Sequence, residues 1–224
     1  MHVELLYHTP DPERAIATAA RLCYAPVGAA ECYLFKQFIC SVLSTIMASG
    51  HFSTLEHVSY TFAIDGVSRA LTHQLVRHRL ASFNQQSQRY VKFKEGVSVV
   101  KPESVLANEE ANAVFDEAIE AATSAYKKLL DAGVPAEDAR YLLPNAAESK
   151  IVVTMNVREL LHFFSLRCCN RAQWEIQIGA HRMLELARPT APFVFADAGA
   201  PCVRGACPEG KMTCGNPYPK VVRE

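Results

Sequence analysis

The chain has 224 residues, and its 23 Lys and Arg are balanced by 23 Asp and Glu, so the formal net charge is zero. This length suits one compact domain with a substantial core, which we expect, or at most two small ones. The charge balance lacks the basic excess of a protein that coats nucleic acid. No segment approaches the roughly 18 to 20 apolar residues of a membrane span, and the first residues do not resemble a signal peptide. We therefore expect a soluble cytoplasmic protein that binds no nucleic acid and no membrane.

The first half of the chain alternates helical and extended patterns. Residues 31–49 carry apolar side chains at three-and-four spacing, which predicts a buried helix followed by Gly50 as its cap; these side chains are Phe35, Phe38, Ile39, Val42, Leu43, Ile46 and Met47. Residues 57–65 alternate apolar and polar side chains, as a half-buried strand does. Asp65 and Gly66 then predict a turn, and residues 67–79 return to helical spacing.

The second half predicts a long helix over about 107–131, a shorter helix after Pro135 and a β-branched strand over 150–156. Two more helices are expected from Asn156 and from about Ala172. Regular patterns end near Arg188, and frequent Gly and Pro predict an irregular tail over 199–224 after a single domain over 1–198. This mixture of helices and strands is typical of the α/β or α+β class.

The eight cysteines are scattered and do not form the framework of a small disulfide-rich protein, so we expect most of them to be reduced thiols. The tail holds Cys202, Cys207 and Cys214, which do not form a CxxC pair. These thiols could hold a zinc ion only with a fourth ligand from elsewhere in the chain. We predict no metal site.

A cluster of basic and polar side chains lies in the stretch QLVRHRLASFNQQSQRY, residues 74–90, and no acidic residue occurs from 66 to 94. The helical pattern places Gln74, Arg77 and His78 on one helix face, and an extended segment places Gln85, Ser87 and Arg89 on another shared side. One explanation is a solvated surface patch. Guanidinium groups beside hydroxyl and amide groups can also hold phosphates and a heterocycle together, so we expect a nucleotide-like ligand.

The stretch RHRLASFNQQSQR, residues 77–89, resembles the signature of flavin-dependent thymidylate synthases, in which Arg-His-Arg is followed by Ser, Asn, Ser and Arg at fixed spacings. The resemblance continues through GHFSTLEH, DARYLLPNA and MNVRELLHFFSLRCCNRAQWEIQ. It implies an α/β fold with an antiparallel sheet packed with helices, and a homotetramer whose sites are shared between chains. The implied activity converts dUMP to dTMP, with methylenetetrahydrofolate as one-carbon donor and FAD reduced by NADPH as hydride source.

The same resemblance implies the ligand-binding residues. For dUMP they are Gln74, Arg77, Gln85, Ser87, Arg89, Arg140 and Arg167, with 85–89 supplied by a neighbouring chain. For FAD they are Ser53, Arg77, His78, Arg79, Gln85, Asn156, Arg158 and His162, although His162 and Gln85 stand where the family has Asn and Glu. The implied catalytic residues are Arg167, which contacts the uracil ring and favours its ionised form, and His51, near the folate and the nucleotide.

The segment NVRELLHFFSLR also carries information of its own. Asn156 and Glu159 have the spacing of a capping box at the start of a helix, which puts Arg167 on the apolar side. Arg167 could equally pair with a buried carboxylate, and the resemblance favours the ligand. Cys168 should face away from Arg167, so we expect a packing residue and no cysteine nucleophile.

Other functions compete with the synthase on the sequence. The basic and polar cluster also fits a different flavin or nucleotide enzyme, or a nucleotide- or RNA-binding module without enzymatic activity. Taken alone, His162 and Arg140 are typical of exposed side chains, and His51 is typical of a turn residue.

Overall fold

The computed structural model describes residues 1–33, 36–93 and 96–220, with the side chains of 36 and 37 left out. Its four-stranded antiparallel sheet has the strand order β1-β2-β4-β3. The strands are β1 (His2–His8), β2 (Ser59–Ser68), β3 (Ala81–Gln85) and β4 (Glu148–Asn156). Helices accompany the sheet, so the predicted class, α/β with an antiparallel sheet packed with helices, is confirmed.

The chain forms two compact units that are interleaved in sequence. The first unit contains Met1–His2, Ile64–Arg77 and Asn84–Ile151, and the second contains Val3–Ala63, His78–Phe83 and Val152–Glu224. The single domain expected over 1–198 stays a prediction. Within its described residues, up to 220, the tail contains two short 3₁₀ turns, Pro201–Val203 and Gly210–Met212.

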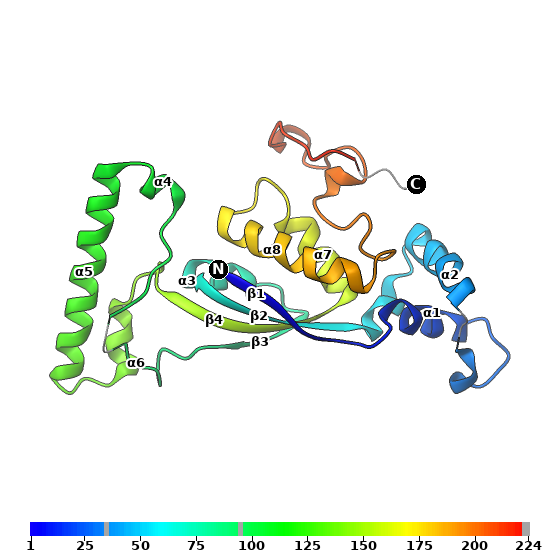
Figure 1. Cartoon of the computed structure of the whole chain (residues 1–224), viewed down its shortest axis with the longest axis horizontal. Helices are drawn as coiled ribbons and strands as arrows, with labels where there is room; N and C mark the ends of the chain where they lie inside the picture. Colours follow the sequence, from blue (N-terminus) through cyan, green and yellow to red (C-terminus); the bar gives the residue numbers. More distant parts are fainter. Residues whose placement is uncertain (34–35, 94–95, 221–224) are drawn as a thin grey trace. The chain divides into compact units, whose positions relative to one another are not determined.

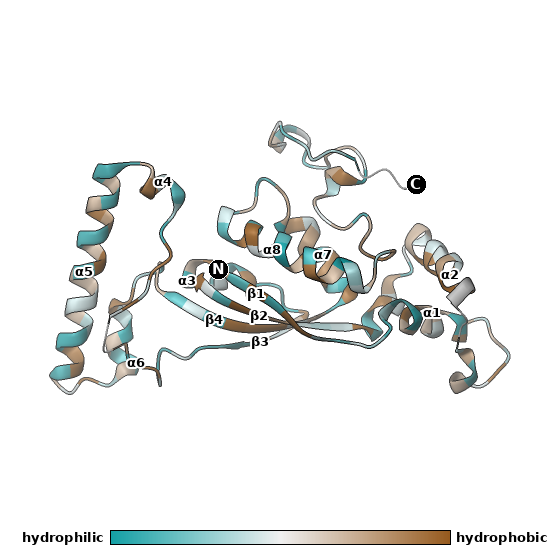
Figure 2. Cartoon of the chain, in the orientation of Figure 1, coloured by the Kyte–Doolittle hydropathy of each residue, from teal (hydrophilic) through white to brown (hydrophobic). Residues whose placement is uncertain are grey.

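The first unit contains α3 (Arg69–Leu75), α4 (Glu103–Leu106), α5 (Glu109–Asp131) and α6 (Ala136–Ala139). The long predicted helix is confirmed as α5, which begins after Asn108 because the Asn108 side chain accepts a hydrogen bond from the Ala111 amide at 3.0 Å. Hydrophilic and hydrophobic residues alternate along α5 (Figure 2). Tyr126, which lies on this helix, is fully buried. The α5 helix packs on α4 and α6.

The second unit contains α1 (Pro12–Leu22), α2 (Lys36–Ser49), α7 (Val157–Arg167), α8 (Trp174–Ala187) and the 3₁₀ helices η1 (Ala29–Cys32) and η2 (Phe52–His57). Helices α7 and α8 lie side by side (Figure 1). Its core holds Tyr60, Phe164 and Phe195 in edge-to-face contact, and the Tyr60 hydroxyl shares a 2.7 Å hydrogen bond with Thr190. This core anchors α7, which carries several of the predicted site residues.

The helix predicted over 31–49 is shorter and less buried than its pattern suggests. It begins at Lys36 as α2, after the separate 3₁₀ helix η1, and Phe35 lies outside the described residues. Ile39, Leu43 and Ile46 are buried, but Phe38 is 50% exposed. Gly50 does follow α2 with a φ of +73°, as a left-handed cap requires.

The turn predicted at Asp65 and Gly66 is wrong, because β2 continues to Ser68. Gly66 takes a φ of +66° within the strand, and the Ser68 hydroxyl then caps α3 by accepting from the Leu71 amide at 3.0 Å. The α3 helix ends at Leu75, four residues before the predicted end at Arg79.

Among the described residues, no helix is both long and apolar enough to cross a membrane.

Candidate active site

His78 connects a buried carboxylate to Arg167 in the second unit. Its Nδ1 lies 3.0 Å from Oε1 of Glu159, and its Nε2 accepts a hydrogen bond from Nε of Arg167 at 3.1 Å. His78 and Glu159 are each 5% exposed, and Arg167 is half-buried. The imidazole therefore lies between an acidic and a basic side chain, with both ring nitrogens engaged.

These contacts fix the protonation state of His78. A guanidinium N–H can only donate, so Nε2 must present a lone pair to Arg167. The single ring proton then lies on Nδ1 and is donated to the Glu159 carboxylate. Burial lowers the pKa of His78, and the Arg167 and His162 charges lower it further, while the hydrogen bond and the charge of Glu159 oppose them. A neutral imidazole is the only form that satisfies both neighbours.

The start of α7 explains how these side chains reach one another. Asn156 caps the helix as predicted, because its Oδ1 accepts from the Glu159 amide at 2.9 Å. The other half of the predicted capping box is absent, since the Glu159 carboxylate contacts His78 instead. Leu160 and Phe163 are buried on the helix, so Arg167 does lie towards the apolar side.

The remaining FAD residues predicted in the second unit have different surroundings. His162 is exposed, and its ring meets the His78 ring edge to face at 6.0 Å between centroids. Arg158 and Glu56 form an exposed ion pair. His51, Ser53 and Arg79 are exposed, and His51 immediately precedes η2. Exposed arginine and histidine donors suit the phosphates of FAD. The ring nitrogens of His78 are already used, so its contact with FAD would have to come from the ring surface or the backbone.

A second group of arginines lies in the first unit. Arg89 donates to Glu137 from Nε and Nη2, at 2.9 and 2.7 Å, and Arg140 donates from Nε to the Glu137 carbonyl at 3.0 Å. The Glu137 carboxylate raises the pKa of Arg89. Burial, followed by the nearby charge of Arg140, lowers the pKa of Arg69, a half-buried residue that the sequence did not single out. Contacts with Glu137 join Arg89 and Arg140, and the charge of Arg140 acts on Arg69, so the three cations lie in one neighbourhood.

The other nucleotide residues predicted in the first unit do not form the expected pair of polar faces. Arg77 follows the end of α3 and is exposed, so it does not share a helix face with Gln74. Strand β3 ends at Gln85, and Ser87 is in a turn where its hydroxyl accepts from the Arg89 amide at 3.2 Å. The predicted helix and the predicted extended segment were therefore both too long, because a turn replaces the end of each.

The amide of Gln85 is held by hydroxyl groups. Its Nε2 donates to Thr72 Oγ1 and to Ser149 Oγ, both at 2.9 Å. Thr72 and Ser149 are buried, so Gln85 satisfies two polar groups that would otherwise be costly to bury. A glutamate at this position could not donate to either hydroxyl, although it could accept from both. Gln85, which stands where the family has Glu, is therefore matched by two hydroxyl groups that accept its hydrogen bonds.

Cys168 has the environment of an inert thiol. It is fully buried, and this burial raises its pKa to about 12, although the charge of Arg188 acts in the opposite direction. A thiol with such a pKa is almost entirely protonated at neutral pH, and the thiolate is the nucleophilic form. The expectation that Cys168 packs in the protein interior agrees with this position.

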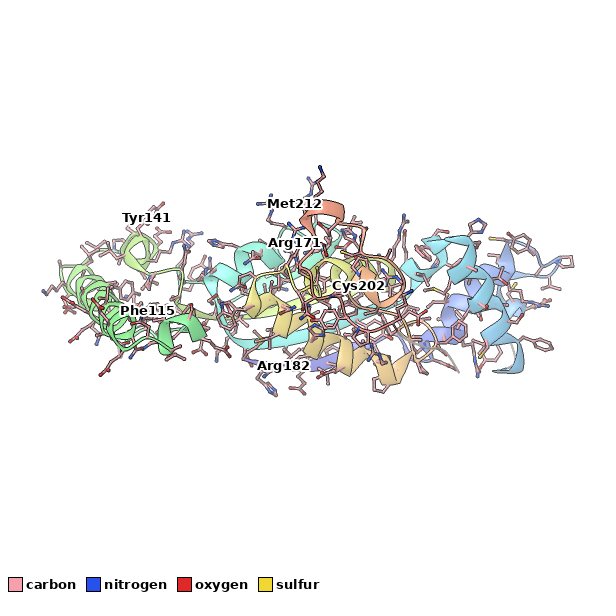
Figure 3. The ribbon with its side chains drawn as sticks, turned by 90° about the horizontal axis from the view of Figure 1, so that it is seen from above. Phe115, Tyr141, Arg171, Arg182, Cys202 and Met212 are labelled. Atoms are coloured by element: carbon pink, nitrogen blue, oxygen red, sulfur yellow. The ribbon has the colours of Figure 1, made fainter. Side chains whose placement is uncertain are left out.

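The tail, the last residues of α7 and the residues that follow them line a pocket of about 230 Å³, to which Arg167 contributes. Arg171 and Cys202 (Figure 3) line it, together with Cys169, Cys207, Cys214 and Tyr218. In the described part of the chain, however, no group of three or more His, Cys, Asp or Glu side chains is arranged to hold a metal ion.

Sequence reasoning missed two carboxylates and a cation of these clusters. Glu159 was explained by its capping spacing, which hid its contact with a histidine 81 positions away. Glu137 and Arg69 had no signal, because nothing in their local pattern indicates that they lie near Arg89 and Arg140. Only the folded chain brings these residues together.

Comparison with known proteins gives consistent matches along the chain. The family model described as "Thymidylate synthase complementing protein" matches residues 4–193. A flavin-dependent thymidylate synthase of Geobacter sulfurreducens is 58% identical over 218 residues, covering 96% of this chain and 94% of that protein. The flavin-dependent thymidylate synthase of Clostridium tetani is 46% identical over 231 residues, covering 95% and 92%.

Among solved structures, the UMP/dUMP methylase PolB of Streptomyces cacaoi, bound with 5-Br dUMP, matches with a TM-score of 0.72 and 28% identity. The match covers 87% of this chain and 93% of that chain. The signature at 77–89, the matched family model and the full-length relatives agree, and the chain belongs to the flavin-dependent thymidylate synthase family.

Proposed function

We propose that this protein converts dUMP to dTMP by reductive methylation. The observation that carries the proposal is the orientation of Arg167, whose Nε is held by a neutral His78 in a chain of this family. A fixed cation beside the uracil ring would stabilise the ring's anionic form, and that form is the better carbon nucleophile. The overall reaction consumes dUMP, methylenetetrahydrofolate, NADPH and a proton, and releases dTMP, tetrahydrofolate and NADP⁺.

In this proposal the first unit supplies groups for the nucleotide phosphate and sugar. Arg89 and Arg140 meet at Glu137, and Arg77 is exposed at the end of α3. Bidentate guanidinium contacts suit a phosphate monoester. Gln74, Gln85 and Ser87 complete the set, and by family resemblance residues 85–89 serve the site of a neighbouring chain. We include the homotetramer in the proposal on the resemblance alone, and the cytoplasmic location as the sequence predicts it.

For FAD the proposal uses donors of the second unit, and Arg77 and Gln85 are included on the resemblance alone. Arg79, Arg158 and His162 are exposed cations or polar rings, which fits a ligand with two phosphates. Ser53 and the Asn156 side chain add hydroxyl and amide groups, although Asn156 already caps α7. The chemistry that FAD supplies when bound and reduced by NADPH is the hydride that completes the methyl group. His51 is proposed to lie near the folate.

The test is to incubate the purified, FAD-loaded protein with NADPH and methylenetetrahydrofolate, adding dUMP in one reaction and UMP in another. We expect dTMP from dUMP, with NADPH oxidation that depends on the nucleotide. The UMP reaction is informative because the structural relative is described as a UMP/dUMP methylase. Methylation of UMP in preference to dUMP would change the substrate, and flavin binding without methylation of either nucleotide would contradict the synthase.

A further inference from the structure

We propose that Glu159 is a positioning residue for Arg167, acting through His78. The contacts form a continuous series in which Arg167 Nε donates to His78 Nε2 and His78 Nδ1 donates to Glu159 Oε1. The inference rests on the proposed function, because it explains how Arg167 is held for the pyrimidine. Glu159 itself would not contact the substrate.

The carboxylate of Glu159 is not needed to start α7. Asn156 already satisfies the Glu159 amide, and the carboxylate turns away from the helix end towards His78. A carboxylate that is 5% exposed is costly unless a donor compensates it. The His78 N–H is that donor, and the positive charge of Arg167 lies on the far side of the same ring. The burial of Glu159 is therefore explained by its hydrogen bond with the histidine that holds Arg167.

The series of contacts also determines which tautomer of His78 can accept a hydrogen bond from Arg167. If the ring proton lay on Nε2, it would oppose the Arg167 Nε–H, and Nδ1 would present a lone pair to the carboxylate. Glu159 excludes this tautomer because an ionised carboxylate can only accept. The acid thus keeps Nε2 available as an acceptor, and the hydrogen bond at Nε fixes the plane of the Arg167 guanidinium before substrate binds. Pre-organised donors lose less entropy on binding.

The first experiment tests the series without any ligand. Histidine ring ¹⁵N shifts are recorded for the full-length protein, and the His78 signals are assigned by their loss in His78→Asn. We expect a neutral ring protonated at Nδ1 at pH 7. An imidazolium at pH 7, or a ring protonated at Nε2, would contradict the proposal.

The second experiment measures dUMP affinity by titration in a double-mutant cycle. Glu159→Met keeps the length of the side chain but cannot accept from His78, and we expect it to weaken dUMP binding about tenfold, the loss typical of one charge-assisted hydrogen bond. In an Arg167→Ala background the same change should cost less than about twofold, because its effect passes through Arg167. Equal losses in both backgrounds would indicate a merely structural role and overturn the proposal.

A conservative variant and a matched control complete the design. Glu159→Gln can still accept a hydrogen bond from the Nδ1–H group through Oε1. Its affinity for dUMP should therefore stay within about threefold of the native protein, and its turnover should be higher than that of Glu159→Met. Glu13 is a carboxylate of the same unit that accepts from the Phe193 amide at 2.7 Å and the Val194 amide at 3.3 Å. Glu13→Met, which removes this acceptor as Glu159→Met removes the acceptor for His78, should lower stability without changing dUMP affinity.

Failure of this inference differs from failure of the proposed function. If the native protein forms dTMP but the effects of Glu159→Met and Arg167→Ala on dUMP affinity are additive, only the positioning role of Glu159 is contradicted. A native protein that neither binds nor methylates dUMP sinks the proposed function, and the positioning role with it. If Glu159→Met does not fold, the ring ¹⁵N spectrum of the native protein and the Glu159→Gln affinity decide the question.

Discussion

Arg89 directs two nitrogens, Nε and Nη2, at the same carboxylate oxygen, Oε2 of Glu137. The N–O distances are 2.9 and 2.7 Å, and both side chains are about half exposed, at 52% and 47%. The carboxylate therefore occupies a position that a phosphate oxygen could take against the same guanidinium. If Arg89 binds the nucleotide phosphate, Glu137 must move aside or share the cation.

Glu137→Gln should strengthen dUMP binding. The change removes a negative charge that competes with the phosphate for Arg89, while it keeps the length of the side chain. Because the ion pair is exposed, we expect a gain of only about two- to fivefold in affinity, which should shrink at high salt. Titration at low and high salt checks this, and weaker binding would mean that Glu137 orients Arg89 for the ligand.

Arg89→Ala should weaken dUMP binding far more than FAD binding. Loss of a bidentate contact to phosphate should reduce dUMP affinity about ten- to hundredfold. FAD affinity, measured on the same preparation, should stay nearly constant. Arg204→Ala is a suitable control, since this exposed arginine donates to the Asp197 carbonyl in the tail. Parallel loss of both ligands in Arg89→Ala would point to collapse of the site.

Arg167→Lys should fold normally and lose most of its turnover. Lysine has no Nε–H group to donate to His78 while presenting a planar face to the pyrimidine. We expect the turnover number to fall by at least about tenfold while the melting temperature changes little, since the half-buried positive charge is kept. Steady-state kinetics and thermal unfolding check this. Full activity would refute the role given to Arg167.

Stability should fall in mild acid because of His78. Its pKa is lowered in the folded protein, mainly by burial, so below about pH 6.5 the unfolded chain takes up a proton that the folded site resists. The contribution is therefore fully present above the unfolded pKa and is lost as the pH falls towards the folded pKa. Glu159, Arg167 and His162 face the ring and set the size of the effect.

The measurement is the free energy of unfolding by denaturant at pH 7.5 and pH 5.5. The native protein should lose more stability between these conditions than His78→Asn does, because asparagine does not titrate. The exposed His73 provides the matched variant, and His78→Asn should reduce the pH dependence more than His73→Asn does. An identical pH dependence in His78→Asn would show that His78 is not the group responsible.

Cys168→Ala should retain dTMP formation. The thiol is buried with a pKa of about 12, so it is a poor nucleophile. Removing the sulfur from a packed site should cost about 1 kcal/mol of unfolding free energy, as for a buried methyl-sized group. Abolished turnover in a folded, FAD-replete variant, or a pyrimidine adduct found on this thiol by mass spectrometry, would overturn the assignment.

Much of the fold follows from local patterns. The alternation around Tyr60 and Phe62 predicted β2, the helical pattern over about 107–131 predicted α5, and the Asn156 cap marked the start of α7. These features were predictable because periodicity and capping depend on residues close in sequence. Strand β1 and helix α1 were not predicted. The boundaries near Gly66 and Arg79 were wrong because the sheet extends β2 and a turn ends α3 early.

The candidate site was only partly predictable for the same reason. The arginines at 77–89 and Arg167 stood out by their charge and by the resemblance. Their partners did not, because Glu159 contacts His78 across 81 positions and Glu137 contacts Arg89 across 48. An acid that supports a distant cation has no local signature, and only the tertiary structure distinguishes it from an ordinary helix-cap or surface carboxylate.

The identity of the folate product tests the central claim most directly. If the hydride comes from reduced flavin and the folate gives only its one-carbon unit, each dTMP must be accompanied by one tetrahydrofolate and the oxidation of one NADPH. We expect this stoichiometry when the purified protein is incubated with dUMP, methylenetetrahydrofolate, FAD and NADPH and the products are separated by chromatography. Formation of dihydrofolate in step with dTMP, or dTMP formed without NADPH oxidation, would contradict the account.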